Sequence, residues 1–98
     1  MTLRILESAK DDLIDGFHFY EEQPPGLGAY FLDSLFSDID SLILYAGIHR
    51  QVLGSYRALS KRFPFAIYYD LTGDEIHVHA VLDCRRRPSW IRRRLSGP

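Results

Sequence analysis

The sequence predicts an α+β domain in which an antiparallel helical hairpin covers one face of a small, mainly antiparallel sheet. Two patterns lead to this prediction. Apolar residues recur at helical spacing in two stretches of the first half, and the second half holds three extended segments rich in β-branched and aromatic residues. The chain has 98 residues, so we expect one domain, residues 1–98, around one core.

The first predicted elements are a short strand and a helix. Leu3 and Ile5 alternate with polar residues, which indicates a half-buried strand. Ser8, with Asp11 three residues later, resembles a capping box and predicts that a helix begins there. Its apolar positions are Leu13, Ile14, Phe17 and Tyr20, and we expect Asp12, Asp15, Glu21 and Glu22 to face solvent. Pro24-Pro25-Gly26 ends the helix, because proline cannot continue the hydrogen-bond ladder.

A second, longer helix is predicted over residues 27–46. Its apolar positions are Phe31, Leu32, Leu35, Phe36, Ile39, Leu42 and Ile43. Gly47 follows at the place where a left-handed residue commonly closes a helix. The short Pro-Gly connection makes the two helices an antiparallel hairpin.

The second half of the chain predicts strands over residues 52–59, 65–71 and 75–82, with a hairpin turn at residues 72–74. Strict alternation puts one set of side chains on each face of the last strand. The two sets are Ile76, Val78, Ala80 and Leu82 on the core side, and His77, His79, Val81 and Asp83 on the other. The sheet face opposite the helices is expected to stay partly open, and Pro88 begins a short C-terminal helix.

The charges are divided unequally between the two halves. Residues 1–49 carry two basic and nine acidic side chains, whereas residues 50–98 carry ten basic and four acidic ones. A basic half indicates an acidic partner or nucleic acid. The alternative is that the two halves neutralise each other within the fold.

Arginines dominate the C-terminal segment. Residues 85–94 include Arg85, Arg86, Arg87, Arg92, Arg93 and Arg94. Guanidinium groups bind phosphates and carboxylates through paired donors, and Trp90 adds a face for stacking. The alternatives are a solubilising tail and a tail that packs against the acidic helices.

Histidines and tyrosines of the predicted sheet are further candidates. His77 and His79, with Asp83 on the same face, have the residue types for acid–base catalysis or metal ligation, and the alternative is a solvent-facing pair. Tyr68 and Tyr69 are expected on opposite faces, one in the core and one on the open face.

Other classes of site find no support in the sequence. Nucleophile elbows, phosphate loops, zinc-ligand spacings and dinucleotide fingerprints are absent, so we expect no cofactor and no metal ion. No apolar run is long enough for a membrane span, and the single cysteine, Cys84, cannot form an internal disulfide. We therefore expect a cytoplasmic protein without membrane contact.

The order of these elements carries a family likeness over nearly the whole chain. Together with Arg-Phe-Pro-Phe at residues 62–65 and Ala-Val-Leu followed by Arg86 and Pro88, it resembles the RelE/ParE superfamily of bacterial type II toxins. The resemblance implies a toxin of a plasmid-stabilisation-like system. It also implies a hetero-oligomer with a cognate antitoxin, whose acidic, amphipathic segment wraps the toxin.

The superfamily implies two targets. RelE-like members cleave ribosome-bound messenger RNA, and ParE-like members poison DNA gyrase without being nucleases. RelE members carry an arginine in the middle strand where this sequence has Phe65, and the tail has no clear catalytic tyrosine, so the ParE-like branch is favoured.

Three hypotheses follow, namely a gyrase-inhibiting toxin, an mRNA endoribonuclease and a non-toxic module that binds nucleic acid or the ribosome. The candidate residues for contact with a target or antitoxin are Arg57, Arg62, Tyr69, Arg85, Arg86, Arg87, Trp90 and Arg93. The candidate catalytic residues, if the protein is a nuclease, are Arg57, Arg86, His77 and His79.

Overall fold

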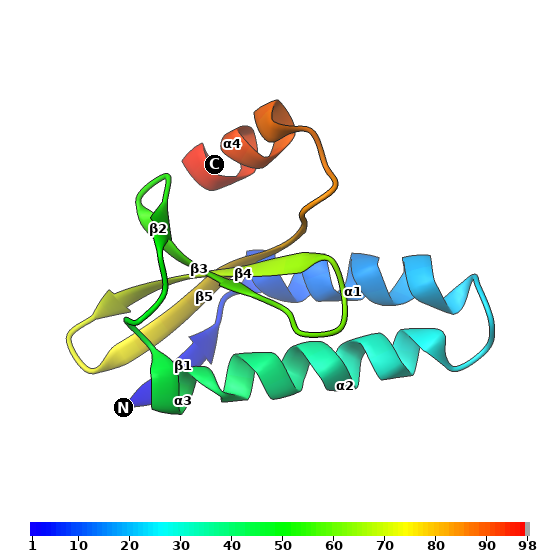
Figure 1. Cartoon of the computed structure of the whole chain (residues 1–98), viewed down its shortest axis with the longest axis horizontal. Helices are drawn as coiled ribbons and strands as arrows, with labels where there is room; N and C mark the ends of the chain where they lie inside the picture. The colour runs from blue at the N-terminus through cyan, green and yellow to red at the C-terminus, as the bar shows by residue number, and fades with distance from the viewer. Residues whose placement is uncertain (98) are drawn as a thin grey trace.

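A computed structural model describes residues 1–97 and confirms the α+β class. The elements are β1 (Thr2–Ile5), α1 (Glu7–Glu21), α2 (Leu27–Asp40), α3 (Leu42–Tyr45), β2 (Gln51–Val52), β3 (Ser55–Leu59), β4 (Phe65–Thr72), β5 (Glu75–Asp83) and α4 (Pro88–Ser96). They form one five-stranded sheet of order β1-β5-β4-β3-β2 (Figure 1). The N-terminal strand β1 runs parallel to β5, and the remaining neighbours are antiparallel.

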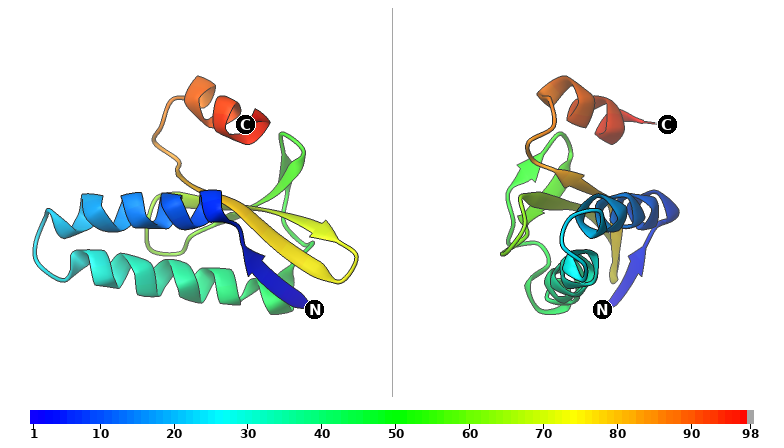
Figure 2. Two further views of the ribbon diagram at one scale, coloured as in Figure 1. Left: turned by 180° about the vertical axis from the view of Figure 1, so that it is seen from behind. Right: turned by 90° about the vertical axis from the view of Figure 1, so that its right-hand side faces the viewer.

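The helices lie on both faces of this sheet. The hairpin of α1 and α2 covers one face, and α4 lies on the other, as the two views in Figure 2 show. The main core is the layer between sheet and hairpin, where the rings of Tyr20, Phe31, Phe63 and Phe65 pack edge-on or stacked. The face expected to stay open is thus partly covered by α4.

The first helix begins without the predicted cap. Leu6 is the N-cap of α1, and no side chain caps the helix. Ser8 Oγ instead donates to the His79 carbonyl at 2.7 Å, and the buried Asp12 Oδ2 accepts the Val81 N–H at 3.0 Å. These bonds satisfy the edge of β5 that β1 leaves free, because β1 pairs only as far as Val78. The expectations that Ser8 caps the helix and that Asp12 faces solvent were wrong.

The predicted helix over residues 27–46 is interrupted at Ser41. The Ser41 hydroxyl donates to the Asp38 carbonyl at 2.6 Å, and the Leu44 N–H donates to the Ser41 carbonyl in a tighter turn. This side-chain bond competes with the helical ladder and separates α2 from α3. Gly47 has a φ of 96°, which confirms the left-handed position predicted after the helix.

The predicted strand over residues 52–59 is two strands joined by a tight turn. Leu53 and Gly54 have φ values of 55° and 87°, so both turn residues are left-handed, as a two-residue hairpin requires. The sequence analysis missed this turn, because Leu53 is not a residue that normally favours a positive φ.

The predicted alternation of β5 is broken by an irregularity at His79. Tyr69 pairs with Val78 and Tyr68 with Ala80, so His79 has no partner of its own. Before the irregularity, Val78 packs into the main core, and after it Val81 does. Ala80 and Leu82 therefore face α4. Asp83 lies with Val81 on the face that α1 and α2 cover, and not beside His77 and His79.

We predict that Gly16→Ala destabilises the protein. An added Cβ would lie 2.5 Å from Phe31 Cζ, and the Phe31 ring is fully buried among other rings. Overpacking costs about 1–3 kcal/mol, which exceeds the roughly 1 kcal/mol that alanine gains over glycine in a helix. Urea unfolding measures the change in the free energy of unfolding. The double variant Gly16→Ala/Phe31→Leu should lose less stability than the sum of the losses in the single variants Gly16→Ala and Phe31→Leu. A more stable Gly16→Ala protein would contradict this packing.

Candidate functional site

The C-terminal helix packs on the sheet through a small second core. Trp90, Ile91 and Leu95 of α4 and Cys84 pack against a buried cluster. That cluster consists of Ala66, Tyr68, Ala80 and Leu82 from β4 and β5. Pro88 occupies the first turn, where its missing N–H has no intrahelical partner to lose. This packing determines which residues of α4 point away from the sheet.

An ion pair between α4 and α1 holds the helix in place. Arg94 donates to both oxygens of Asp12, at 2.6 and 2.8 Å, and Asp12 is only 8% exposed. The hydrogen bonds that Arg94 donates to the Asp12 carboxylate raise the pKa of Arg94 above its ordinary value. Part of the arginine-rich tail therefore packs against an acidic helix, which was the alternative to a binding role.

Two further arginines are engaged within the protein. Arg85 forms a double hydrogen bond with the Asp83 carboxylate at 3.0 and 2.7 Å, and its backbone N–H donates to the same group. These bonds hold the pKa of Asp83 below its usual value. The Arg86 guanidinium lies 4.3 Å from the centre of the Trp90 ring, a cation–π contact that occupies one face of the indole.

The remaining arginines of the tail point to solvent. Arg87, Arg92 and Arg93 are exposed, and none forms an ion pair within residues 1–97. Arg92 and Arg93 line a shallow hollow on the outer side of α4. Of the predicted contact residues in the tail, Arg87 and Arg93 are thus free to bind an anion, and Arg92 joins them. Sequence reasoning grouped the six arginines in one cluster and chose Arg85, Arg86, Arg87 and Arg93 as contact residues, because it could not assign their internal partners.

A polar group of side chains lies on the α4 side of β3 and β4. Arg57 Nε donates to the Tyr68 hydroxyl at 3.2 Å, and its Nη2 lies 3.5 Å from Cys84 Sγ. His79 Nε2 lies 2.9 Å from Ser55 Oγ and 3.5 Å from Asp70 Oδ2. This group brings one predicted arginine and one predicted histidine onto the same face of the sheet.

The histidines do not form the constellation that the sequence predicts. His77 Nε2 contacts Glu75 Oε1 at 2.6 Å, whereas His79 contacts Ser55 and Asp70. Asp83 is paired with Arg85 on the other face. The expectation of His77, His79 and Asp83 on one face was wrong, because the irregularity at His79 reverses the alternation. Within the described part of the chain, no three His, Cys, Asp or Glu side chains gather as metal ligands would.

Tyr69 and Arg62 lie away from this face. Tyr69 is fully buried in the main core, stacks on Tyr56 and bonds His49 Nδ1 at 2.5 Å and the Gly47 N–H at 2.9 Å. Burial raises its pKa. Tyr69 therefore cannot contact a partner, which corrects its place among the candidates. Arg62 is exposed with its guanidinium over the Tyr30 ring of α2.

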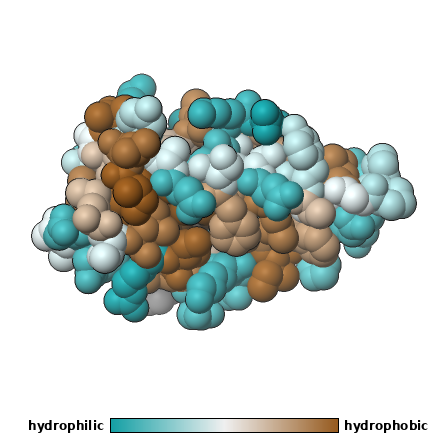
Figure 3. Space-filling model, turned by 90° about the horizontal axis from the view of Figure 1, so that it is seen from below, coloured by the Kyte–Doolittle hydropathy of each residue, from teal (hydrophilic) through white to brown (hydrophobic). Residues whose placement is uncertain are grey.

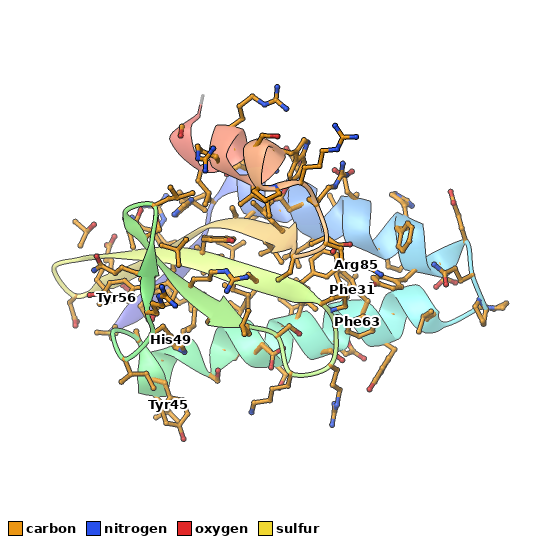
Figure 4. The ribbon with its side chains drawn as sticks, turned by 45° about the horizontal axis from the view of Figure 1, so that its top comes forward. Phe31, Tyr45, His49, Tyr56, Phe63 and Arg85 are labelled. Carbon is orange, nitrogen blue, oxygen red and sulfur yellow. The ribbon has the colours of Figure 1, made fainter. Side chains whose placement is uncertain are left out.

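Figure 4 shows the spread of these side chains over the molecule. Tyr56 and His49 lie together at one end of the sheet, and Arg85 lies at the other, near Phe31 and Phe63. The sequence analysis did not predict the ion pair between Asp12 and Arg94. The available signal for Asp12 was its spacing of four residues from Gly16, since both lie on the buried side of α1.

We predict that Arg94→Met loosens α4 while the rest of the protein stays folded. Removing the guanidinium leaves the buried Asp12 carboxylate uncompensated, at a cost of about 3 kcal/mol. Trp90 is the only tryptophan and packs on the sheet, so its fluorescence should shift to the red. The control is Arg93→Met, which removes an exposed charge. Equal spectra for both variants would show that the ion pair does not hold the helix.

We also predict an acid-dependent loss of stability from Asp83. Its pKa is lowered in the folded protein by the Arg85 hydrogen bonds, so the stabilisation is present above the ordinary value of about 4 and is lost as the pH falls further. Arg85 is well exposed, so the effect is below about 1 kcal/mol. Urea unfolding of Asp83→Asn should show a weaker pH dependence than the original chain, and Asp33→Asn should show none of this change.

Known proteins resemble this chain in structure rather than in sequence. No family model and no curated protein matches it. One chain of a solved structure described as the chromosomal ParDE TA system from P. aeruginosa superposes with a TM-score of 0.74. The two sequences are 21% identical, and the match covers 83% of this chain and 92% of the other. This chain therefore has a ParE-like fold, the fold implied by its resemblance to the RelE/ParE superfamily.

Proposed function

We propose that the protein is the toxin of a type II toxin–antitoxin system. In this proposal it arrests growth by inhibiting DNA gyrase and is neutralised by a cognate antitoxin. The observation that carries the proposal is the fold shared over 83% of the chain with a chain of a ParDE system. No helix in residues 1–97 is long and apolar enough to cross a membrane.

The choice of gyrase over RNA is supported by the side chains of β4. Ala66 and Tyr68 face α4 in the second core, and alternation places Asp70 on the same side. None of these residues is basic. Phe65, which stands where the sequence analysis expects the arginine of RelE members, packs in the main core beneath α1 and α2. The middle strand thus offers no cation to stabilise a phosphate undergoing cleavage.

The exposed arginines of α4 are the proposed contact with the target. Arg92 and Arg93 lie on α4 and Arg87 is its N-cap residue, and none of the three forms an ion pair within residues 1–97. Guanidinium groups suit carboxylates on a protein as well as phosphates, because both accept paired N–H donors. Arg86 and Trp90 support this surface through their stacking contact.

RNA cleavage is the second candidate, and one observation favours it. Arg57 meets the Tyr68 hydroxyl on the same sheet face where His79 meets Ser55. An arginine for phosphate and a histidine for proton transfer are the groups that ribonucleotide cleavage needs. Arg86 is engaged with Trp90 and His77 with Glu75, so the other two candidate catalytic residues are tied to internal partners.

We predict that induction of this chain alone arrests bacterial growth and that purified protein inhibits gyrase supercoiling. Arg87→Gln/Arg92→Gln/Arg93→Gln should weaken inhibition about 100-fold, at about 1 kcal/mol for each exposed charge contact. Arg4→Gln/Lys10→Gln is the control, because it removes cations from β1 and α1 and should inhibit normally. Supercoiling assays give the inhibitory concentrations.

The outcomes separate the candidate functions. Normal growth at confirmed expression would contradict the toxin proposal. A second outcome is that transcripts are cleaved soon after induction, that Arg57→Gln abolishes this cleavage and that supercoiling is unaffected. The target would then be messenger RNA and not gyrase. Growth unaffected together with strongly salt-dependent binding to nucleic acid would indicate the non-toxic binding module.

A further inference from the structure

The tight turn between β2 and β3 holds a leucine in a backbone conformation that leucine rarely adopts. Leu53 and Gly54 form this two-residue turn, with φ values of 55° and 87°. Leu53 is the only residue other than glycine that has a positive φ in residues 1–97. Asparagine, aspartate and glycine are the usual residues at its position, because they adopt the left-handed conformation at little steric cost. The leucine therefore makes the turn less stable than an Asn-Gly turn would be.

Packing inside the chain does not compensate for this strain. The Leu53 side chain is 52% exposed and belongs to neither of the two buried clusters nor to the side chains that pack against them. β2 pairs with β3 through backbone hydrogen bonds, which other residues at the turn would leave in place. A residue that breaks a local rule without a compensating contact inside the chain indicates a role in function.

The hairpin of β2 and β3 carries this leucine on the α4 side of the molecule. It rises from the sheet on the side where α4 lies, as Figures 1 and 2 show. The Arg57 N–H donates to the Arg50 carbonyl at 2.9 Å, so the two residues are opposite each other and their side chains share one face. This is the face of α4, because Arg57 contacts Tyr68 there. Arg50 is exposed and forms no ion pair within residues 1–97.

Leu53 is separate from the larger group of exposed apolar side chains. That group belongs to α2, α3 and the loop after α3, and its members are Tyr30, Phe36, Ile43, Leu44, Tyr45 and Ile48. Figure 3, which views the molecule from the side of α2, shows apolar side chains gathered toward the end that carries α3. Leu53 projects instead at the tip of the hairpin. It is an isolated apolar side chain next to a cation, and not the margin of a broad apolar face.

We propose that Leu53 is an anchor that enters an apolar pocket of the protein target, while carboxylates around that pocket contact Arg50 and the exposed arginines of α4. Apolar anchors in pockets dominate the energetics of protein interfaces. The turn fixes the backbone of Leu53 before binding, so the contact loses little conformational entropy. The inference rests on the proposed function for the identity of the partner, which is gyrase.

The apolar tip and the cations argue against other partners. A nucleic acid would contact Arg50 through its phosphates, but Leu53 would gain apolar contact only by unstacking the bases, at a cost in free energy. A second copy of the chain would have to offer its acidic helices to the hairpin. Such a contact joins two different surfaces and extends into open chains instead of closing as a dimer. A protein pocket with an acidic rim satisfies both features.

Leu53→Asn tests the inference because it should affect stability and inhibition in opposite directions. Asparagine suits the left-handed position, so the urea midpoint should stay equal or rise. The variant lacks the apolar anchor, so its inhibition of gyrase supercoiling should weaken about tenfold or more. Leu53→Gly should behave in the same way. Leu53→Met retains an apolar side chain and should inhibit normally. Leu44→Gln is the matched control, because it removes a leucine that is 80% exposed on α3, and it should also inhibit normally.

Four outcomes would overturn the inference. Normal inhibition by Leu53→Asn would show that the target does not contact the hairpin. A fall in the urea midpoint together with weaker inhibition, in both Leu53→Asn and Leu53→Gly, would show that the side chain serves the fold. Normal inhibition with weaker antitoxin binding would assign the hairpin to the antitoxin. Self-association of the original chain in sedimentation velocity, lost in Leu53→Asn, would assign it to a second copy.

The same assays separate this inference from the proposed function. If the original chain and Leu53→Asn inhibit gyrase equally and both arrest growth, the inference fails and the toxin proposal stands. If the original chain arrests growth through cleaved transcripts while supercoiling is unaffected, gyrase is not the target and the inference fails with that assignment. If the original chain neither arrests growth nor inhibits gyrase, both proposals fail, because the inference takes its partner from the proposed function.

Discussion

The Asp12 carboxylate connects all three layers of this protein. It accepts the Val81 N–H at an edge of β5 that no strand covers, and it accepts both donors of Arg94 from α4. A buried carboxylate is costly unless its oxygens are satisfied, and here the backbone and a guanidinium satisfy them together. The position of α4, and with it the outward direction of the basic surface, depends on this group.

This constraint changes the meaning of the arginine-rich tail. The small apolar contact of Trp90, Ile91 and Leu95 supports a short helix that would be unstable alone. Arg94 and Arg85 serve the fold through carboxylates, and Arg86 serves it through the indole ring. Within residues 1–97, Arg87, Arg92 and Arg93 have no such partner, so the unpaired basic surface is narrower than a count of arginines indicates.

The molecule presents two surfaces of different physical character. The outer side of α4 is polar and cationic, which suits recognition of anionic groups through exposed side chains. The groove between α3 and β3 is lined by the exposed apolar side chains of Tyr45, Ile48 and Leu59. The two surfaces share no lining residue.

The sequence by itself determined the α+β class, the helical hairpin and the turn at Gly73, because periodicity and turn residues act locally. It also located Gly47 and the C-terminal helix. Only the tertiary structure decided which arginines are paired, that Tyr69 is buried, and that the face of β5 changes at His79. These features depend on contacts between residues far apart in the chain, such as Asp12 with Arg94, and no local pattern encodes such a pairing.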